Sequence, residues 1–389
     1  MDARIEVNRH YPALDGLRAC AVLMVFFQHY LLAYIPILWQ WGWAGVDFFF
    51  VLSGFLITGI LYDTRESQHR FKNFYIRRTL RIFPLYYGVL LVILLLSPVM
   101  HWEWSFKWLC WPLYVSNYVR FAFMGEFLLS HRTLESLFSS KTIVHIPVRL
   151  FLGHFWSLAV EEQFYLLWPL VVFALKDRAK LRNICACVVV LMPFIRLASG
   201  FLLPHSWIQE GCLERMTPFR ADALLLGGML ALMIRGREGD TLKRIAPKVG
   251  GICLLILFLV PAIAPIVSAR VNVGSSSLWM GSFGLSLIEL FGGSVILMLL
   301  NDGSQLSRLL SVAPIRRLGE ISYGFYVFHD IPHLFYIAIA TSILGKYSAG
   351  AMFLTIPIAF VFTLFLSLVS YRFFEMPFLR LKDRLAPTR

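Results

Sequence analysis

Ten long apolar runs constrain this chain more than any other feature of its sequence. A helix that crosses a membrane needs about 20 mainly apolar residues. Only 15% of the residues are charged, against about 25% in soluble domains. The sequence therefore predicts an all-α polytopic membrane protein with about ten transmembrane helices, forming a single membrane-embedded domain over residues 1–389. The predicted spans are 13–36, 44–62, 80–100, 155–175, 184–203, 220–235, 249–268, 277–300, 319–343 and 350–371.

The basic residues predict the orientation of these spans. Of the 36 Lys and Arg residues, 26 lie on one side of the predicted membrane. The positive-inside rule makes this side cytoplasmic, together with both termini and the basic tail 372–389. This topology explains the net charge of +13, so no nucleic acid partner is predicted. The opposite side carries the long stretch 101–154, which we expect at the membrane interface because aromatic residues gather near its start.

The first span contains an aligned Arg and His. Arg18 and His29 are eleven residues apart, which in a helix is three turns plus about 20° and about 16 Å along the axis. Both side chains then point the same way, with Arg18 at the cytoplasmic mouth. A neutral buried imidazole can act as a general base near pH 7. The structural alternative is a His bonded to a backbone carbonyl, with Arg18 as a topology anchor.

The third span begins with a second basic pair. Arg78 and Arg81 are neighbours on one helix face, again at the cytoplasmic mouth. Forked guanidinium donors suit phosphate groups. Anchoring the span is the alternative role, but the convergence of Arg18, Arg78 and Arg81 on one membrane face favours phosphate binding.

Three carboxylates are candidates to orient His29. Asp47 lies in the outer part of the second span and could either approach His29 or cap a helix start. Glu161 and Glu162 open the fourth span and point about 100° apart, so at most one faces the interior. A solvated or ion-paired role is equally open for either.

Other polar residues in the spans are predicted to be structural. Ser53-Gly54 reads as a close contact between helices. Arg220 and Asp222 could pair with each other or across helices. His329 and Asp330 lie midway in the ninth span, where a hydrogen-bonded structural His is favoured.

Several catalytic motifs are missing from the sequence. It contains no GxSxG, GxGxxG or P-loop pattern, and no HExxH zinc motif. A serine hydrolase, a nucleotide-hydrolysing pump and a zinc protease are therefore disfavoured, and no metal site is predicted.

Seven sequence blocks, in order, resemble the acyltransferase 3 family of integral membrane acyltransferases. The resemblance extends from about residue 10 to residue 380 and includes the Arg-x10-His and Arg-x-x-Arg patterns. The blocks are Tyr11–Arg18 with His29, Gly45–Gly54, Arg78–Arg81, Phe155–Tyr165, Arg220–Leu224, Gly319–Tyr323 with His329, and Tyr371–Pro377.

The resemblance implies an O-acyltransferase. Such an enzyme moves an acyl group, commonly acetyl from acetyl-CoA, to a hydroxyl of a carbohydrate or glycolipid acceptor such as lipopolysaccharide O-antigen or exopolysaccharide. It also implies a bacterial inner membrane location among lipids. Because the chain ends shortly after its last predicted span, we expect no fused esterase-like domain.

The resemblance and the spacing together give one hypothesis. Arg78 and Arg81, assisted by Arg18, bind the phosphates of acyl-CoA, which is a donor substrate and not a resident cofactor. His29 acts as general base or as a transient acyl carrier, oriented by Asp47, Glu161 or Glu162. The alternative is a secondary transporter with a buried Arg/His site, although the internal repeats typical of that class are not seen.

Overall fold

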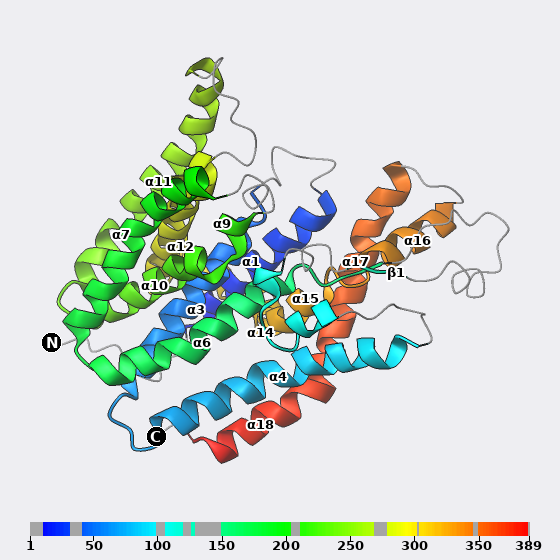
Figure 1. Ribbon diagram of the computed structural model, residues 1–389, viewed down its shortest axis with the longest axis horizontal. Helices are drawn as coiled ribbons and strands as arrows, with labels where there is room; N and C mark the ends of the chain where they lie inside the picture. The colour runs from blue at the N-terminus through cyan, green and yellow to red at the C-terminus, as the bar shows by residue number, and fades with distance from the viewer. Residues whose placement is uncertain are drawn as a thin grey trace. The chain divides into compact units, whose positions relative to one another are not determined.

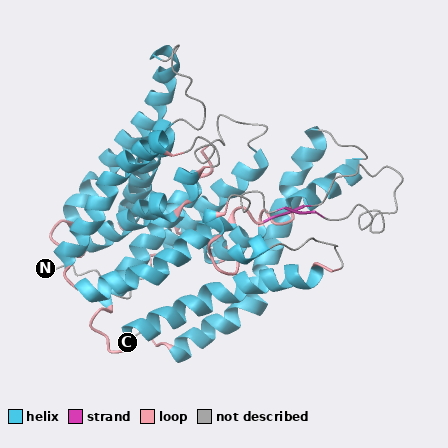
Figure 2. Cartoon of the chain, viewed as in Figure 1, coloured by secondary structure: helices cyan, strands magenta, loops and turns pink. Residues whose placement is uncertain are grey.

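The part of the chain that the structure describes is mostly helical. A computed structural model describes residues 11–31, 41–98, 106–119, 126–128, 149–203, 211–267, 278–301, 303–344 and 349–387. Figure 1 labels the elements, and Figure 2 shows that helices make up nearly all of the regular structure in this part of the chain. The predicted all-α architecture is confirmed. The one addition is a short antiparallel ribbon in which Phe127 pairs with Leu150.

The described residues form α-helices, 3-10 helices, two short strands and two π-helices. The α-helices are α1 (Pro12–Leu31), α3 (Ala44–Asp63), α4 (Arg70–Leu96), α6 (Phe155–Leu175), α7 (Arg178–Leu202), α9 (Cys212–Arg215), α10 (Thr217–Met233), α11 (Gly239–Val267), α12 (Leu285–Leu299), α13 (Gln305–Leu310), α14 (Ala313–Glu320), α15 (Ser322–Phe328), α16 (His333–Leu344), α17 (Ala349–Val369) and α18 (Met376–Leu385). The others are the 3-10 helices η1 (Phe106–Cys110) and η2 (Ser116–Tyr118), the strands β1 (Glu126–Leu128) and β2 (Arg149–Phe151), and the π-helices η4 (Met280–Gly284) and η5 (Ser370–Glu375).

Several of these helices can span a membrane. Within the described residues, seven are long and apolar enough to do so by length and composition. Each of the ten predicted spans overlaps at least one helix, but the count of ten and the cytoplasmic placement of the termini stay predictions. The seven are Ala44–Asp63, Arg70–Leu96, Phe155–Leu175, Arg178–Leu202, Cys212–Met233, Met280–Leu299 and Phe353–Leu385.

The ninth predicted span is not one continuous helix. Residues 319–343 are divided among α14, α15 and α16, and residues 329–332 are not helical. Pro332 is one cause, because proline disfavours the helical conformation of the residue before it. The ninth predicted span thus contains a break, and this break carries His329 and Asp330.

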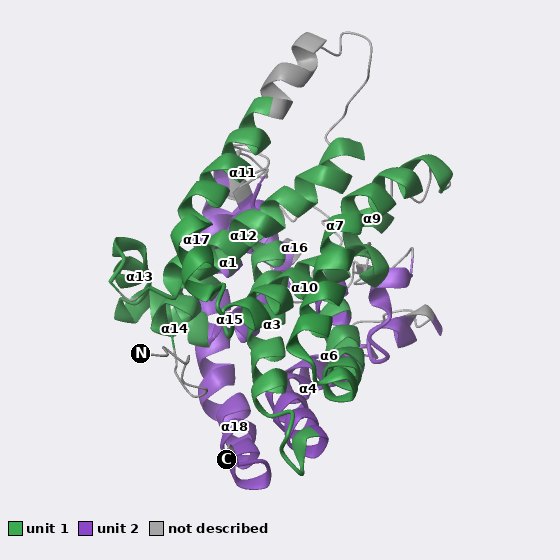
Figure 3. Ribbon diagram, turned by 90° about the vertical axis from the view of Figure 1, so that its left-hand side faces the viewer, with its two compact units in different colours: residues 1–21, 43–70, 160–320 green, residues 22–42, 71–159, 321–389 purple. Residues whose placement is uncertain are grey.

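The chain forms two compact units, each built from stretches that are separate in the sequence (Figure 3). Unit 1 comprises residues 1–21, 43–70 and 160–320, and unit 2 comprises residues 22–42, 71–159 and 321–389. Neither unit is a continuous segment of the chain. Helix α1 begins in unit 1 and ends in unit 2.

In unit 1, α3 and α10 pack with their backbones in close contact. A Cβ atom on Gly54 would lie 1.8 Å from the carbonyl oxygen of Leu224, and one on Gly227 would lie 1.9 Å from that of Val51. Only glycine fits at such distances. The contact predicted for Ser53-Gly54 is confirmed, and small residues at helix interfaces are typical of membrane proteins.

In unit 2, α4 holds the aromatic segment 106–119. The Tyr86 hydroxyl donates to the carbonyl of Trp111 at 2.7 Å, and the Tyr86 and Tyr114 rings stack at 4.3 Å. Trp111 and Tyr114 are both buried. The prediction of an interfacial position for this aromatic stretch stays untested, and Trp102 and Trp104 lie outside the described residues.

Candidate active site

His29 lies near the end of α1, a helix that is continuous from Pro12 to Leu31. This continuity supports the helical spacing assumed for Arg18 and His29. The Nδ1 atom of His29 lies 2.9 Å from the carbonyl oxygen of Val25, one turn earlier. Because a carbonyl oxygen only accepts hydrogen bonds, Nδ1 carries the ring proton. In the neutral ring Nε2 therefore holds the lone pair, and the side chain is 33% exposed.

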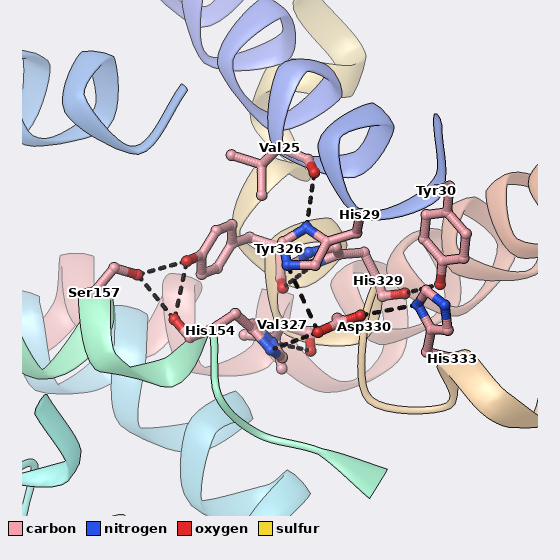
Figure 4. A network of polar contacts seen from close by, with 10 residues as sticks. All are labelled: Val25, His29, Tyr30, His154, Ser157, Tyr326, Val327, His329, Asp330 and His333. Atoms are coloured by element: carbon pink, nitrogen blue, oxygen red, sulfur yellow. Dashed lines mark hydrogen bonds and ion pairs between the residues drawn. The ribbon is translucent and has the colours of Figure 1, made fainter. Parts of the chain in front are cut away.

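Asp330 is the carboxylate that contacts His29. Its Oδ2 atom lies 3.7 Å from Nε2 of His29 and 3.9 Å from Nδ1 of His154. Its Oδ1 atom accepts a hydrogen bond from Nδ1 of His333 at 3.1 Å. Figure 4 shows the carboxylate among these imidazoles. We call His29, His154, His329, Asp330 and His333 the histidine cluster, and all five belong to unit 2.

The helix break at residues 329–332 explains how the cluster forms. A helix end leaves backbone carbonyls without intrahelical donors. At the end of α15, Nδ1 of His329 donates to the carbonyl of Tyr326 at 2.6 Å, and Nε2 of His154 donates to that of Val327 at 3.2 Å. The hydrogen-bonded structural role predicted for His329 is thus supported by its contacts.

Hydroxyl groups complete this network in unit 2. The Tyr30 hydroxyl donates to the carbonyl of His329 at 2.6 Å. The Tyr326 hydroxyl donates to the carbonyl of His154 at 3.0 Å, and Ser157 donates to the same carbonyl at 3.1 Å. These bonds tie the start of α6 and the end of α1 to the broken helix.

Asp47 lies in a different cluster, in unit 1. Its carboxylate pairs with Arg220, and both side chains are buried. Asp222 pairs in the same way with Arg196, so the inter-helix alternative for Arg220 and Asp222 is confirmed. Glu289 lies 3.4 Å from Arg196 and 3.7 Å from Arg220. We call these five residues, from α3, α7, α10 and α12, the charge cluster.

The two glutamates of α6 also belong to unit 1. Oε1 of Glu161 accepts a hydrogen bond from the Ser53 hydroxyl at 2.6 Å. Glu161 and Glu162 are both half-buried. Within unit 2, the carboxylate in contact with His29 is Asp330, and the structure gives Asp47 and Glu161 other polar partners in unit 1.

The predicted phosphate-binding arginines occupy the expected helices. Arg18 pairs with Asp15 at 2.6 Å, with 25% of its side chain exposed. Arg78 and Arg81 are partly buried on α4, and both interact electrostatically with Lys382 of α18.

Sequence reasoning did not single out Arg196, Glu289 or His154. Arg196 and Glu289 each stand alone within an otherwise apolar predicted span. Because an ionised group inside a membrane is costly, that isolation was itself the signal for a functional or paired residue. His154 directly precedes the Phe155–Tyr165 block, and only the fold reveals its approach to Asp330.

The histidine cluster can perform proton transfer. One imidazole, that of His29, combines an unprotonated nitrogen with an exposed edge and a neighbouring carboxylate. These are the properties of a general base or a nucleophile. Across the described residues, no group of His, Cys, Asp or Glu side chains has the arrangement of a metal site.

Comparisons with known proteins identify what the chain is similar to. Residues 11–372 match the acyltransferase domain family, acyltransferase 3. Similar curated proteins include the peptidoglycan O-acetyltransferase OatA of Listeria monocytogenes, which is 28% identical over 83% of this chain and 49% of the relative. The putative peptidoglycan O-acetyltransferase YrhL of Bacillus subtilis is 29% identical over 96% of this chain and 56% of the relative.

A putative O-acetyltransferase of Staphylococcus aureus strain COL is 27% identical over 95% of this chain and 57% of the relative. The chain thus spans about half the length of these curated relatives. No solved structure matches it significantly.

Proposed function

The chain belongs to the acyltransferase 3 family, and from this premise we propose that it is a membrane O-acyltransferase that transfers acetyl from acetyl-CoA to a hydroxyl of a cell-envelope carbohydrate. The observation that carries this proposal is His29, whose side chain is 33% exposed and whose Nε2, the acceptor nitrogen of the neutral ring, faces a carboxylate. The relatives named as peptidoglycan O-acetyltransferases make peptidoglycan the first acceptor to test. Lipopolysaccharide O-antigen and exopolysaccharide follow.

In the proposed reaction, His29 acts as general base. The acceptor hydroxyl donates its proton to Nε2 as its oxygen attacks the thioester carbonyl. The new C–O bond forms, the C–S bond breaks, and the proton passes from Nε2 to the departing sulfur. The products are the acetyl ester and coenzyme A. A covalent route in which Nε2 carries the acetyl group uses the same lone pair.

The arginines supply the proposed donor site. Arg78 and Arg81 are adjacent on one face of α4, and Arg18 lies at the cytoplasmic mouth predicted for α1. Guanidinium groups bind phosphate oxygens through paired donors. We propose that Arg78 and Arg81 bind the phosphates of acetyl-CoA on the cytoplasmic side of a bacterial inner membrane.

The test of the base is transfer of labelled acetyl from acetyl-CoA by purified protein in lipid nanodiscs. Peptidoglycan fragments, lipopolysaccharide and exopolysaccharide are offered separately as acceptors. His29→Ala should abolish transfer while the protein still inserts and keeps its melting temperature. His69→Ala, which removes an exposed histidine, is the matched control and should transfer normally. Near-normal transfer by His29→Ala would refute the base assignment.

The donor site has its own test. Arg78→Ala and Arg81→Ala should raise the KM for acetyl-CoA with a smaller effect on kcat, because the lost contact binds substrate and transition state alike. Arg308→Ala removes an exposed arginine and should leave the KM unchanged. Normal binding of labelled acetyl-CoA by the Arg78 and Arg81 variants would contradict the phosphate site.

A further inference from the structure

When His29 and His154 are neutral, the carboxylate of Asp330 faces the unprotonated nitrogen of each ring. Nδ1 of His29 and Nε2 of His154 each donate to a backbone carbonyl. In the neutral rings, Nε2 of His29 and Nδ1 of His154 are therefore acceptors, like the carboxylate oxygen opposite them. The separations of 3.7 Å and 3.9 Å fit this arrangement, since two acceptors form no hydrogen bond with each other.

The contact becomes favourable only when an imidazole gains a proton. A proton on Nε2 of His29 would convert two facing acceptors into an N–H group and a carboxylate of opposite charge. An interaction that strengthens during the reaction accelerates it, whereas one that is equally strong in the ground state does not. Asp330 is placed to make an interaction of the first kind.

Exposure decides which imidazole takes the proton. The side chain of His29 is 33% exposed and that of His154 is 2% exposed. His329 packs edge-on against both rings, with centroid distances of 4.9 Å and 4.8 Å, and its Nδ1 is bonded to a carbonyl. An acceptor hydroxyl can therefore reach His29 while His154 stays enclosed.

Asp330 is held in place before any reaction occurs. His333 donates to its Oδ1 atom, and the His333 ring stacks on Tyr30 with centroids 4.6 Å apart. The segment around Asp330 is fixed as well, because the backbone N–H of Phe151 donates to the carbonyl of Ile331 at 3.2 Å. A preorganised carboxylate costs no rearrangement when the charge on His29 develops.

We infer that Asp330 is a positioning residue for acyl transfer, which stabilises the protonated imidazole of His29 while the acceptor oxygen attacks. This inference rests on the proposed function of His29 as general base. Asp330 keeps its charge throughout: the proton moves from the acceptor hydroxyl to Nε2 of His29 and then to the thiolate of coenzyme A. The charged and titratable groups around His29 in unit 2 are Asp330, His329 and, across the carboxylate, His154.

The experiment compares kcat and KM of Asp330→Asn with those of the unchanged protein at neutral pH. We expect kcat to fall by about 100-fold, the scale of general acid–base assistance, with the KM for acetyl-CoA within twofold. This split between kcat and KM is the signature of an interaction that is made in the transition state and not in substrate binding.

Two further variants separate charge from structure. Asp330→Glu keeps the charge and should restore part of kcat. Asp63→Asn is the matched control, because Asp63 is a carboxylate of similar exposure, 11% against 10%, paired with Arg235. It should leave kcat and the KM unchanged. If Asp330→Asn does not fold, Asp330→Ser provides the neutral variant.

The outcomes distinguish this inference from the proposed function. If His29→Ala is inactive but Asp330→Asn keeps the original kcat, the positioning role is refuted and the general base stands. If Asp330→Glu loses as much kcat as Asp330→Asn, or both variants melt at a much lower temperature, Asp330 is merely structural. If His29→Ala remains active, the proposed function itself fails.

Discussion

Replacing Arg196 by methionine removes the centre of the charge cluster. Besides its pairs with Asp222 and Glu289, the guanidinium of Arg196 donates to the carbonyls of Phe219 and Ser282, at 2.8 Å and 3.2 Å. The side chain is fully buried. Arg196→Met leaves Arg220 as the one cation facing three buried carboxylates of this cluster.

The expected loss of stability is large. Removing one partner of a buried ion pair costs about 3–5 kcal/mol because the other charge is left uncompensated. At roughly 2 °C per kcal/mol, the melting temperature should fall by about 6–10 °C. Asp222→Asn removes the opposing charge. The double variant, Arg196→Met with Asp222→Asn, loses both charges of the pair and leaves neither one uncompensated. Its loss in free energy of unfolding should therefore be smaller than the sum of the two single losses by about 1–3 kcal/mol.

The assay is thermal unfolding of the purified protein in one detergent, followed by circular dichroism. Arg182→Met is the control, since Arg182 forms a 2.8 Å pair with Glu238 in which both side chains are about one-third exposed. A pair of this kind contributes at most about 1 kcal/mol. The reasoning is refuted if Arg196→Met melts within 2 °C of the unchanged protein, or if the two single losses simply add in the double variant.

Three smaller predictions test the packing and surface of the two units. Gly54→Val should force α3 from α10, because its Cβ would overlap the carbonyl of Leu224, and the yield of monodisperse protein in detergent should drop sharply. Tyr86→Phe should lower stability by about 1 kcal/mol through loss of its bond to Trp111, measured by thermal melting. Glu66→Gln breaks an exposed pair and should change the melting temperature by less than 2 °C, since such pairs contribute little.

Hydropathy was sufficient to locate most of the fold. Burying apolar surface along 20 residues is a local requirement, so runs such as 44–62 and 155–175 correspond closely to α3 and α6. Helical spacing also placed Arg18 and His29 correctly on one continuous helix. The break within the ninth predicted span was not predicted, because it depends on Pro332 and on side chains from elsewhere in the chain that cap α15.

The candidate site was only partly predictable, because contacts between residues far apart in the sequence leave no local pattern. His29 stands out as an ionisable residue within an apolar run. Its carboxylate partner is about 300 positions away, and nothing periodic links Asp330 to α1. Asp47 was a reasonable candidate by hydropathy, but its actual partner, Arg220, could be found only once α3 and α10 were packed together.

The charge cluster also has a consequence for how the chain enters the membrane. Arg196 emerges from the ribosome 26 residues before Asp222 and 93 before Glu289. At a synthesis rate of about 5–20 residues per second, Asp222 follows Arg196 after roughly 1–5 s and Glu289 follows it after roughly 5–19 s. An unpaired guanidinium is poorly tolerated by lipid during that time. We therefore expect α7 to stay in contact with the translocon until α10 has been synthesised. The order of synthesis then contributes to the assembly of unit 1.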